Sequence, residues 1–312
     1  MLAEFTNKCL ARYGIHYGWV MASLVFVTTM VSSSVSTVPQ IIILPITREF
    51  DWQISDVSNA IGLMYVVLAC FAPFASALML KIGVRNVVLT AATMNSCGLF
   101  LITQADHRWH LLLSVGVLMG AAAGIIGVGL AATVATRWFV RRRGLVVGVL
   151  ASAFAAGQLL FVPLLAWLTT VVDWRYALVI PIIGGFFSAL LFLLFSKDWP
   201  YDLRLTPLGE KEMFAPPKHD GKNAFFTSLN VLLKSANEPA FWILASTFMI
   251  CGLSSTGIVG QHFIPFCADN NVGIVAASSY LAIMGIFNFI GTIGSGWLSD
   301  RYNNYHLLMW YY

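Results

Sequence analysis

The chain alternates long apolar blocks with short polar segments. Most of the blocks reach or exceed the roughly 18 apolar residues that a helix needs to cross a bilayer. Because hydrocarbon offers no water, the backbone groups of such a block must be satisfied within it, and helices are the expected form. The predicted spans are Tyr17–Leu44, Ser58–Leu80, Val87–Gln104, Trp109–Trp138, Gly144–Val172, Tyr176–Phe195, Phe241–Cys267 and Val275–Leu298.

The amino-acid composition changes after the sixth apolar block, and this change divides the chain. Residues 196–240 are polar, carry both signs of charge and include several prolines, so we expect a cytoplasmic linker with a short surface helix within Ala224–Leu233. The predicted domains are therefore a six-helix bundle over 1–195, the linker over 196–240, and a second bundle over 241–312. A ninth apolar run begins near Tyr305 and the sequence stops inside it, so the expectation is a second bundle that is cut short.

Composition agrees with a membrane protein. The 312 residues are 58% apolar and only 10% charged, with a mean hydropathy of +0.78. A soluble domain carries about 25% charged residues. The predicted class is therefore an all-α, polytopic membrane protein.

The basic residues predict an orientation. If the N-terminus lies in the cytoplasm, alternating the loops leaves only Arg48, Arg108 and Arg175 outside, and the other fifteen of the 18 Lys and Arg residues inside. Cytoplasmic loops of membrane proteins carry such an excess of basic residues. The net charge of +4 follows from this loop bias and gives no reason to expect a nucleic-acid partner.

Glycines at helical spacing predict close helix packing. The fourth span has Gly116, Gly120 and Gly124 four residues apart, and the fifth span opens with Gly144 and Gly148. Small residues on one face let two helix backbones approach in lipid. Packing alone accounts for this pattern without any contact to a substrate.

Two loops look like copies of each other. The loop after the eighth span holds Gly296, Asp300 and Arg301, and a fainter version after the second span holds Gly83 and Arg85. Similar loops at matching places indicate a duplicated architecture related about the membrane normal. An acidic–basic pair at a helix end can bind a neighbouring helix in one conformation and release it in another, so these five residues are candidate conformational-switch positions.

Four further stretches carry a family resemblance. Gly296-x-x-x-Asp300-Arg301 resembles the cytoplasmic loop motif of the major facilitator superfamily. Residues 16–19 read His-Tyr-Gly-Trp, 137–139 read Arg-Trp-Phe, 141–144 read Arg-Arg-Arg-Gly, and 262–269 read His-x-x-Pro-x-x-x-Asp. Together they resemble the bacterial members of the branch that contains monocarboxylate-transporter-like and oxalate/formate-antiporter-like proteins.

The resemblance implies a two-bundle fold and a carrier function, with one departure. In animal monocarboxylate transporters the eighth span carries an Asp and, four residues later, an Arg that serve proton and carboxylate binding. Alignment through Gly296 places Asn288 and Thr292 at those positions, and a Lys of the first span corresponds to Gln40. The chain therefore keeps the framework of the branch without its charged carboxylate site.

The polar groups inside the spans are uncharged, apart from histidine. A charge at the centre of a span would cost about 2.5–3.5 kcal/mol and would mark function. Amides and hydroxyls can also simply bond between helices, so a packing role stays open for each of them. The candidate substrate-cavity residues are Gln40, Tyr65, Gln158, His262, Asn288 and Thr292.

The leading hypothesis is a secondary transporter in the inner membrane of a bacterial cell. It would move a small organic solute, by resemblance a monocarboxylate or similar organic anion, by alternating access. The expected partners are this substrate, protons as candidate co-substrates, and membrane lipid. No nucleophile elbow, phosphate-binding loop, metal motif or paired carboxylate is found, so neither an enzyme nor a cofactor is expected. The alternative is a degenerate or receptor-like membrane protein that does not transport.

Overall fold

The computed structural model describes residues 2–210, 212–213 and 224–311. It is 85% helical, and no strand occurs within those ranges, as predicted for an all-α protein. Eight helices are long and apolar enough to cross a membrane, which confirms the eight predicted spans. The surface helix predicted within the linker is also confirmed, as α11 (Ala224–Ser235).

Several spans are built from more than one helical segment. The first comprises α2 (Gly18–Ser32) and α3 (Ser34–Phe50), and the next two are α4 (Ile54–Ile82) and α5 (Val84–Thr103). The remaining N-terminal spans are α6 (Arg108–Leu111) with η1 (Leu112–Met119) and α7 (Gly120–Trp138), then α8 (Arg143–Val171), then α9 (Trp174–Ala177) with α10 (Val179–Phe195). The later spans are α12 (Pro239–Cys251) with η3 (Gly252–Gln261) and α13 (His262–Asp269), then α14 (Ile274–Ser299). Outside the spans lie α1 (Leu2–Arg12), η2 (Pro200–Leu203) and α15 (Asn304–Tyr311).

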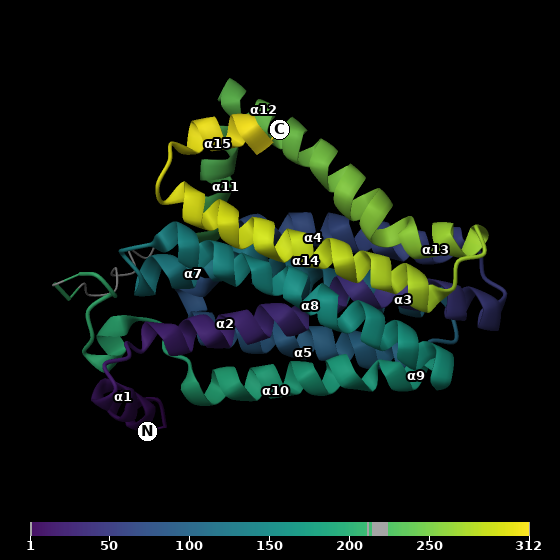
Figure 1. The fold of residues 1–312 in the computed structure, drawn as a ribbon, viewed down its shortest axis with the longest axis horizontal. Helices are drawn as coiled ribbons and strands as arrows, with labels where there is room; N and C mark the ends of the chain where they lie inside the picture. The colour runs from purple at the N-terminus through teal and green to yellow at the C-terminus, as the bar shows by residue number, and fades with distance from the viewer. Residues whose placement is uncertain (1, 211, 214–223, 312) are drawn as a thin grey trace.

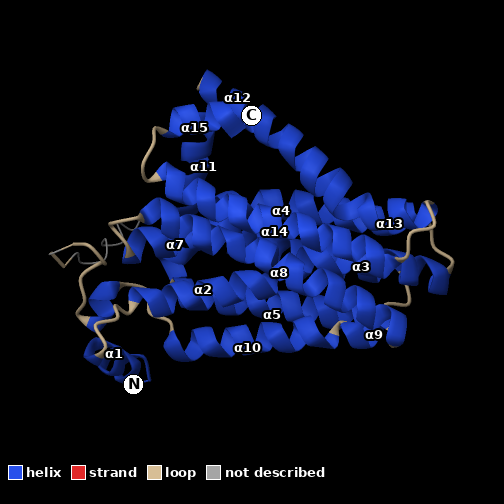
Figure 2. Cartoon of the chain, viewed as in Figure 1, coloured by secondary structure: helices blue, strands red, loops and turns tan. Residues whose placement is uncertain are grey.

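The long helices lie side by side, so the connecting loops gather at two ends (Figures 1 and 2). α14 runs along α8, and this is the most extensive contact between any two of the described helices. α12 leans away from the other spans, and none of its described residues is buried. The loops with Gly83 and Asp300 share one end, which is the predicted cytoplasmic end.

The first span is divided at Ser33 into α2 and α3, although the Ser33 backbone keeps helical angles, and the apolar pattern did not predict this division. The Ser33 hydroxyl donates to the Met30 carbonyl at 2.7 Å, and the Thr37 hydroxyl donates to the Ser33 carbonyl at 3.1 Å. Hydroxyls that bond back to the preceding turn compete with helical hydrogen bonds and bend helices. Pro39 and Pro45 then remove two more donors from α3.

The glycines of the fourth span pack as expected. A Cβ placed on Gly120 would lie 2.7 Å from the Met64 carbonyl oxygen, and one on Gly124 would lie 2.7 Å from the Leu68 carbonyl oxygen. Both contacts are to the backbone of α4, which cannot move aside as a side chain could. The glycine stripe therefore sets the close approach of α7 to α4.

Residues 16–19 and 137–139, which are far apart in sequence, meet at the predicted cytoplasmic end. The Tyr17 hydroxyl donates to the Phe195 carbonyl at 2.6 Å, and its ring packs 5.9 Å from the Trp138 ring. His16 Nε2 lies 2.9 Å from the Thr206 carbonyl oxygen. The Leu208 N–H donates to the Trp138 carbonyl at 2.8 Å. These contacts attach the start of the linker to the N-terminal helices.

Candidate functional site

α8 and α14, which belong to different predicted bundles, touch through glycines. A Cβ on Gly148 would lie 2.9 Å from the Cα of Gly296, and a Cβ on Gly296 would lie 2.8 Å from the Cα of Gly148. Gly144 also has no room for a side chain, because a Cβ placed on it would lie 2.8 Å from the Gly296 carbonyl oxygen. The two backbones are therefore in direct contact at the predicted cytoplasmic end.

Asp300 caps α8 across this contact. Its two carboxylate oxygens accept hydrogen bonds from the backbone N–H groups of Gly144 and Leu145, each at 2.8 Å. The first N–H groups of a helix have no partner inside it, and the helix dipole favours a negative charge there. One carboxylate at the end of α14 thus satisfies the first turn of another helix.

The two members of the Asp300–Arg301 pair point to different partners. Arg301 is exposed, and its guanidinium lies 4.1 Å from the centre of the Trp297 ring, on its own helix. Only Asp300 reaches across to α8. Of the five candidate switch residues, Gly296 and Asp300 therefore form the contact between the helices, while Arg301 stays beside it.

The copy of this loop near Gly83 has a different acidic partner. Asp198, three residues after α10 ends, accepts hydrogen bonds from the N–H groups of Val84 at 2.7 Å and Arg85 at 3.3 Å. Gly83 has a φ of +86°, and a Cβ there would collide with the Asp198 carboxylate. The Arg85 side chain is exposed. Both loops therefore feature a carboxylate that caps the start of a helix, although Asp198 comes from a distant segment.

Asn288 and Thr292 lie together on α14. The Thr292 hydroxyl donates to the Asn288 carbonyl at 2.7 Å and lies 3.2 Å from its side-chain oxygen. Both residues line a hollow of about 710 Å³ between α8 and α14, which Arg143, Ser295 and Tyr311 also border. The Asn288 side chain is exposed.

The other candidate cavity residues do not gather at that hollow. Tyr65, on α4, accepts a hydrogen bond from the Gln261 side-chain nitrogen at 2.8 Å. Gln40 is buried in α3, and Gln158 is half-buried on α8. His262 is exposed, whereas its neighbour Gln261 is buried. The structure thus brings Asn288 together with Thr292, and pairs Tyr65 with a glutamine rather than with His262.

Pro265 explains why Gln261, and not His262, faces the helices of the first bundle. Proline has no N–H, so the carbonyl of Gln261, four residues earlier, loses its α-helical partner. The preceding segment, Gly252–Gln261, is a π-helix, and the wider turn changes which side chains face inward. An exposed histidine beside a buried glutamine is the result.

Asp198 is the functional candidate that the sequence patterns did not select. It follows the sixth span at a place that matches none of the family motifs. An acidic residue shortly after a predicted cytoplasmic helix end was the available signal, but its partners lie 113 and 114 positions away. Such a distant pairing cannot be read from local spacing.

Comparison with known proteins adds a family match. A family model described as Major Facilitator Superfamily matches residues 22–312. The protein named Monocarboxylate transporter 11 of Mus musculus is 26% identical over 293 residues, which cover 91% of this chain and 60% of the relative. The protein named Uncharacterized MFS-type transporter YhjX of Escherichia coli K12 is 26% identical over 258 residues, covering 82% and 60%. Monocarboxylate transporter 12-B of Danio rerio is 24% identical over 302 residues, covering 91% and 62%. The chain thus spans about 60% of the length of these relatives.

Proposed function

Because the chain belongs to the Major Facilitator Superfamily, we propose that it forms the membrane part of a secondary transporter that works by alternating access. The observation that supports this most directly is the contact of Asp300 with the first turn of α8. Alternating access requires that two bundles close at one end of the membrane and part again. A polar contact at the edge of two helices is suited to such a change.

The hydrogen bonds between Asp300 and α8 are strong enough to keep the two helices together and weak enough to break during a conformational change. Hydrogen bonds to a charged group contribute about 1.5–3 kcal/mol each, and Asp300 is exposed, so solvent weakens them toward the lower end. When Asp300 leaves, water can satisfy both its carboxylate and the N–H groups of Gly144 and Leu145. The glycines then part without leaving an apolar side chain in water.

The proposed substrate is a monocarboxylate or a similar small organic anion. This rests on the names of the relatives, several of which are monocarboxylate transporters. The proposed contacts are Asn288 and Thr292, which border the hollow between α8 and α14. Gln40, Tyr65, Gln158 and His262 do not border that hollow, and their role in substrate binding stays a prediction from the sequence. An anion in a low-dielectric cavity needs a positive partner or several strong donors. We infer that the Asn288 amide acts as such a donor beside Arg143, which borders the same hollow, and that protons are the co-substrate that lowers the charge to be carried.

The test is transport by the purified chain in proteoliposomes. Uptake of labelled acetate, lactate and pyruvate is measured for the wild type, for Asp300→Ala and for the control Glu238→Ala. Glu238 precedes α12, and its side chain makes no capping hydrogen bond. We expect Asp300→Ala to slow uptake about tenfold or more, because it removes two hydrogen bonds to a charged group, each worth about 1.5 kcal/mol. The control should transport as the wild type does.

Membrane insertion must be unchanged for the comparison to count, so protease protection is measured on the same samples. Equal rates in the wild type and Asp300→Ala would contradict the role of the carboxylate. A correctly inserted protein that takes up none of the acids would overturn the transporter proposal and favour the receptor-like alternative.

A further inference from the structure

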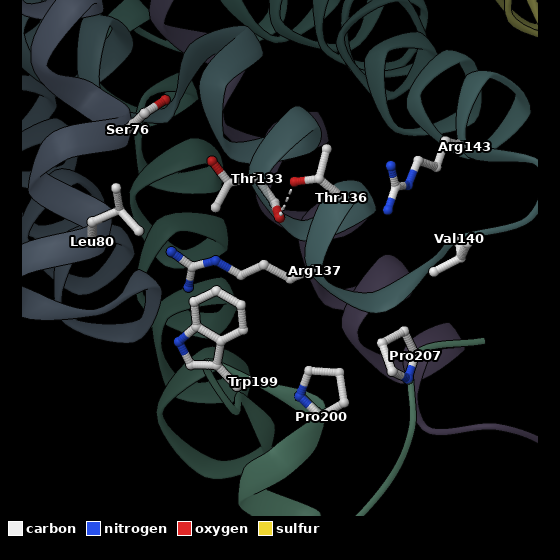
Figure 3. Close-up of a pocket in the computed structure, with 10 residues that line it drawn as sticks. All are labelled: Ser76, Leu80, Thr133, Thr136, Arg137, Val140, Arg143, Trp199, Pro200 and Pro207. Atoms are coloured by element: carbon white, nitrogen blue, oxygen red, sulfur yellow. Dashed lines mark hydrogen bonds between the residues drawn. The ribbon is translucent and has the colours of Figure 1, made fainter. Parts of the chain in front are cut away.

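A second cavity, of about 410 Å³, lies at the predicted cytoplasmic end and shares Arg143 with the hollow between α8 and α14 (Figure 3). Ser76 and Leu80 of α4 border one side, and Thr133 and Thr136 of α7 border another. Trp199, at the start of the linker, borders a third side of the cavity. None of these residues belongs to the candidate switch or to the candidate substrate contacts.

Arg137 is the buried charge at this cavity. Its side chain is 7% exposed, and its guanidinium lies 4.3 Å from the centre of the Trp199 ring. Nη1 donates to the Asp198 backbone carbonyl at 3.3 Å, while Nη2 is buried and has no hydrogen-bond partner. A buried charged donor without a partner is strongly unfavourable, so the site is incomplete as it stands.

The charges of the nearest carboxylates, those of Asp198 and Asp202, attract the Arg137 guanidinium, but neither carboxylate accepts a hydrogen bond from its Nη2 atom. The Asp198 carboxylate accepts hydrogen bonds from the backbone N–H groups that start α5. The Asp202 carboxylate accepts one from the backbone N–H of Trp199 at 3.1 Å. Among the residues that the structure describes, no ion pair includes Arg137. Neither aspartate borders the cavity.

Arg143 supplies a second positive charge. Its Nε donates to the Phe139 carbonyl at 2.7 Å, which fixes the side chain and leaves its terminal nitrogens available. Figure 3 shows Arg137 and Arg143 bordering the cavity from different sides, with Thr136 between them. The site therefore offers two guanidinium groups, neighbouring hydroxyls and no lining carboxylate.

We propose that this cavity binds a phosphate group. Arginine matches phosphate oxygens with parallel hydrogen bonds, and such charge-assisted bonds are about twice as strong as neutral ones. A phosphate group presents oxygens in several directions, so one oxygen can accept from Nη2 of Arg137 while others face the second arginine and the hydroxyl groups that border the cavity. The bound group joins the end of α7 to the start of the linker, since Arg137 and Trp199 both border it. Its source is either the headgroup of an anionic phospholipid or a soluble phosphate compound.

The experiment measures thermal unfolding of the purified chain, with no transport assay. Inorganic phosphate is titrated at constant ionic strength into protein held in nanodiscs of phosphatidylcholine. A second series uses nanodiscs in which part of this lipid is replaced by phosphatidylglycerol. The variants are Arg137→Gln, Arg137→Lys and the matched control Arg142→Gln, which lies in the same loop and does not border the cavity.

We expect a saturable rise in melting temperature for the wild type, because a ligand that binds only the folded state stabilises it. Arg137→Gln should weaken the apparent affinity about tenfold or more, since it removes a buried charged donor. Arg142→Gln should change it less than twofold. A response to inorganic phosphate assigns a soluble ligand, and a response to phosphatidylglycerol alone assigns the lipid.

Arg137→Lys keeps the charge if the glutamine variant fails to fold. We expect an affinity several-fold below that of the wild type, because an ammonium cannot stack on Trp199 or bind phosphate through two parallel bonds. Equal losses in the variants at positions 137 and 142 would show general surface attraction and overturn the proposal. So would the absence of a saturable response to both phosphate and phosphatidylglycerol.

Discussion

At the scale of single residues, the hydrogen bond from Gln261 to Tyr65 joins two spans that lie 196 positions apart. The second polar atom of the glutamine side chain, Oε1, is buried without a partner. The Ser36 hydroxyl also interacts with Tyr65. Tyr65, Gln261 and Ser36 therefore form a small polar cluster between spans of the two predicted bundles.

We predict that Tyr65 and Gln261 stabilise the protein jointly. Hydrogen bonds between membrane helices contribute about 0.6 kcal/mol on average, and losing one partner also leaves the other unsatisfied. A double-mutant cycle with Tyr65→Phe and Gln261→Met, measured by unfolding in detergent, should give a coupling of about 0.6–1.5 kcal/mol. The exposed Tyr176 provides a control, because Tyr176→Phe should show no coupling to Gln261→Met. Additive effects at positions 65 and 261 would contradict this prediction.

The chemical class of the site residues was predictable from the sequence, but their partners were not. Uncharged amides and hydroxyls at Gln40, Asn288 and Thr292 follow from the cost of charge in the bilayer. Which neighbour faces inward depends on the rotation of the helix. The π-helix that ends at Gln261 changes that rotation. His262 was selected by its residue type, as a histidine inside a span, and residue type does not reveal which neighbour faces inward.

At the scale of helices, the contact of α8 with α14 depends on the absence of side chains. A methyl group on Gly148 would meet the Gly296 backbone on one side and the Thr292 carbonyl oxygen, at 2.9 Å, on the other. Neither is the flexible end of a side chain. By contrast, a methyl group on Gly294, on the same helix as Gly296, would meet nothing within 4 Å.

We predict that Gly148→Ala separates the two helices at the predicted cytoplasmic end. Overpacking of this kind costs about 1–3 kcal/mol, so we expect a lower melting temperature and a more open contact. A cysteine introduced at Ser295, in a background without native cysteines, should then react with a maleimide several-fold faster. The control Gly294→Ala should leave both the labelling rate and the melting temperature unchanged. Unchanged labelling in Gly148→Ala would show that the contact tolerates a methyl group.

The existence of the spans was predictable, whereas their interruptions were not. Hydropathy depends on the average over a whole segment, so all eight spans could be located from apolar blocks. The division at Ser33 depends on two hydroxyls that bond to particular carbonyls. The π-helix Leu112–Met119 lies in an apolar run with no local mark that sets it apart.

At the scale of the whole molecule, the two ends differ in how their arginines are held. At the predicted external end, Arg175 Nη2 lies 2.8 Å from Glu49 Oε1, and Arg108 Nη1 lies 3.3 Å from Asp56 Oδ1. The Trp174 indole also donates to Glu49, at 2.7 Å. The three arginines that the topology places outside thus include two with acidic partners from neighbouring spans.

We predict that the N-terminus and the Asp300 loop are cytoplasmic and that Arg108 faces outward. The reason is the excess of basic residues at the opposite end from Arg108. Intact cells carrying a single cysteine at position 108 should be labelled by a membrane-impermeant maleimide. A single cysteine at position 85 should be labelled only after permeabilisation and is the matched control. Labelling of position 108 only from the cytoplasm would reverse the assignment.

The division into two bundles at residues 196–240 stays a prediction from sequence. How the linker attaches to the N-terminal helices could not have been foreseen, because it depends on Leu208 pairing with the backbone of Trp138, 70 positions earlier. Contacts between distant backbone segments leave no periodic pattern in the residues that make them. The family motifs marked one side of this contact without revealing its partner.

The contacts of Asp198 and Tyr17 also impose an order on synthesis. Spans leave the ribosome one after another, and domains generally fold from the N-terminal side first. The first turn of α5 must therefore wait for a carboxylate that is made more than a hundred residues later, and the Tyr17 hydroxyl must wait for the carbonyl of Phe195, 178 positions on. Until then the start of α5 has free N–H groups that face water at the membrane surface. These two contacts between the first six spans can form only when the linker begins to emerge, before the predicted second bundle has been made.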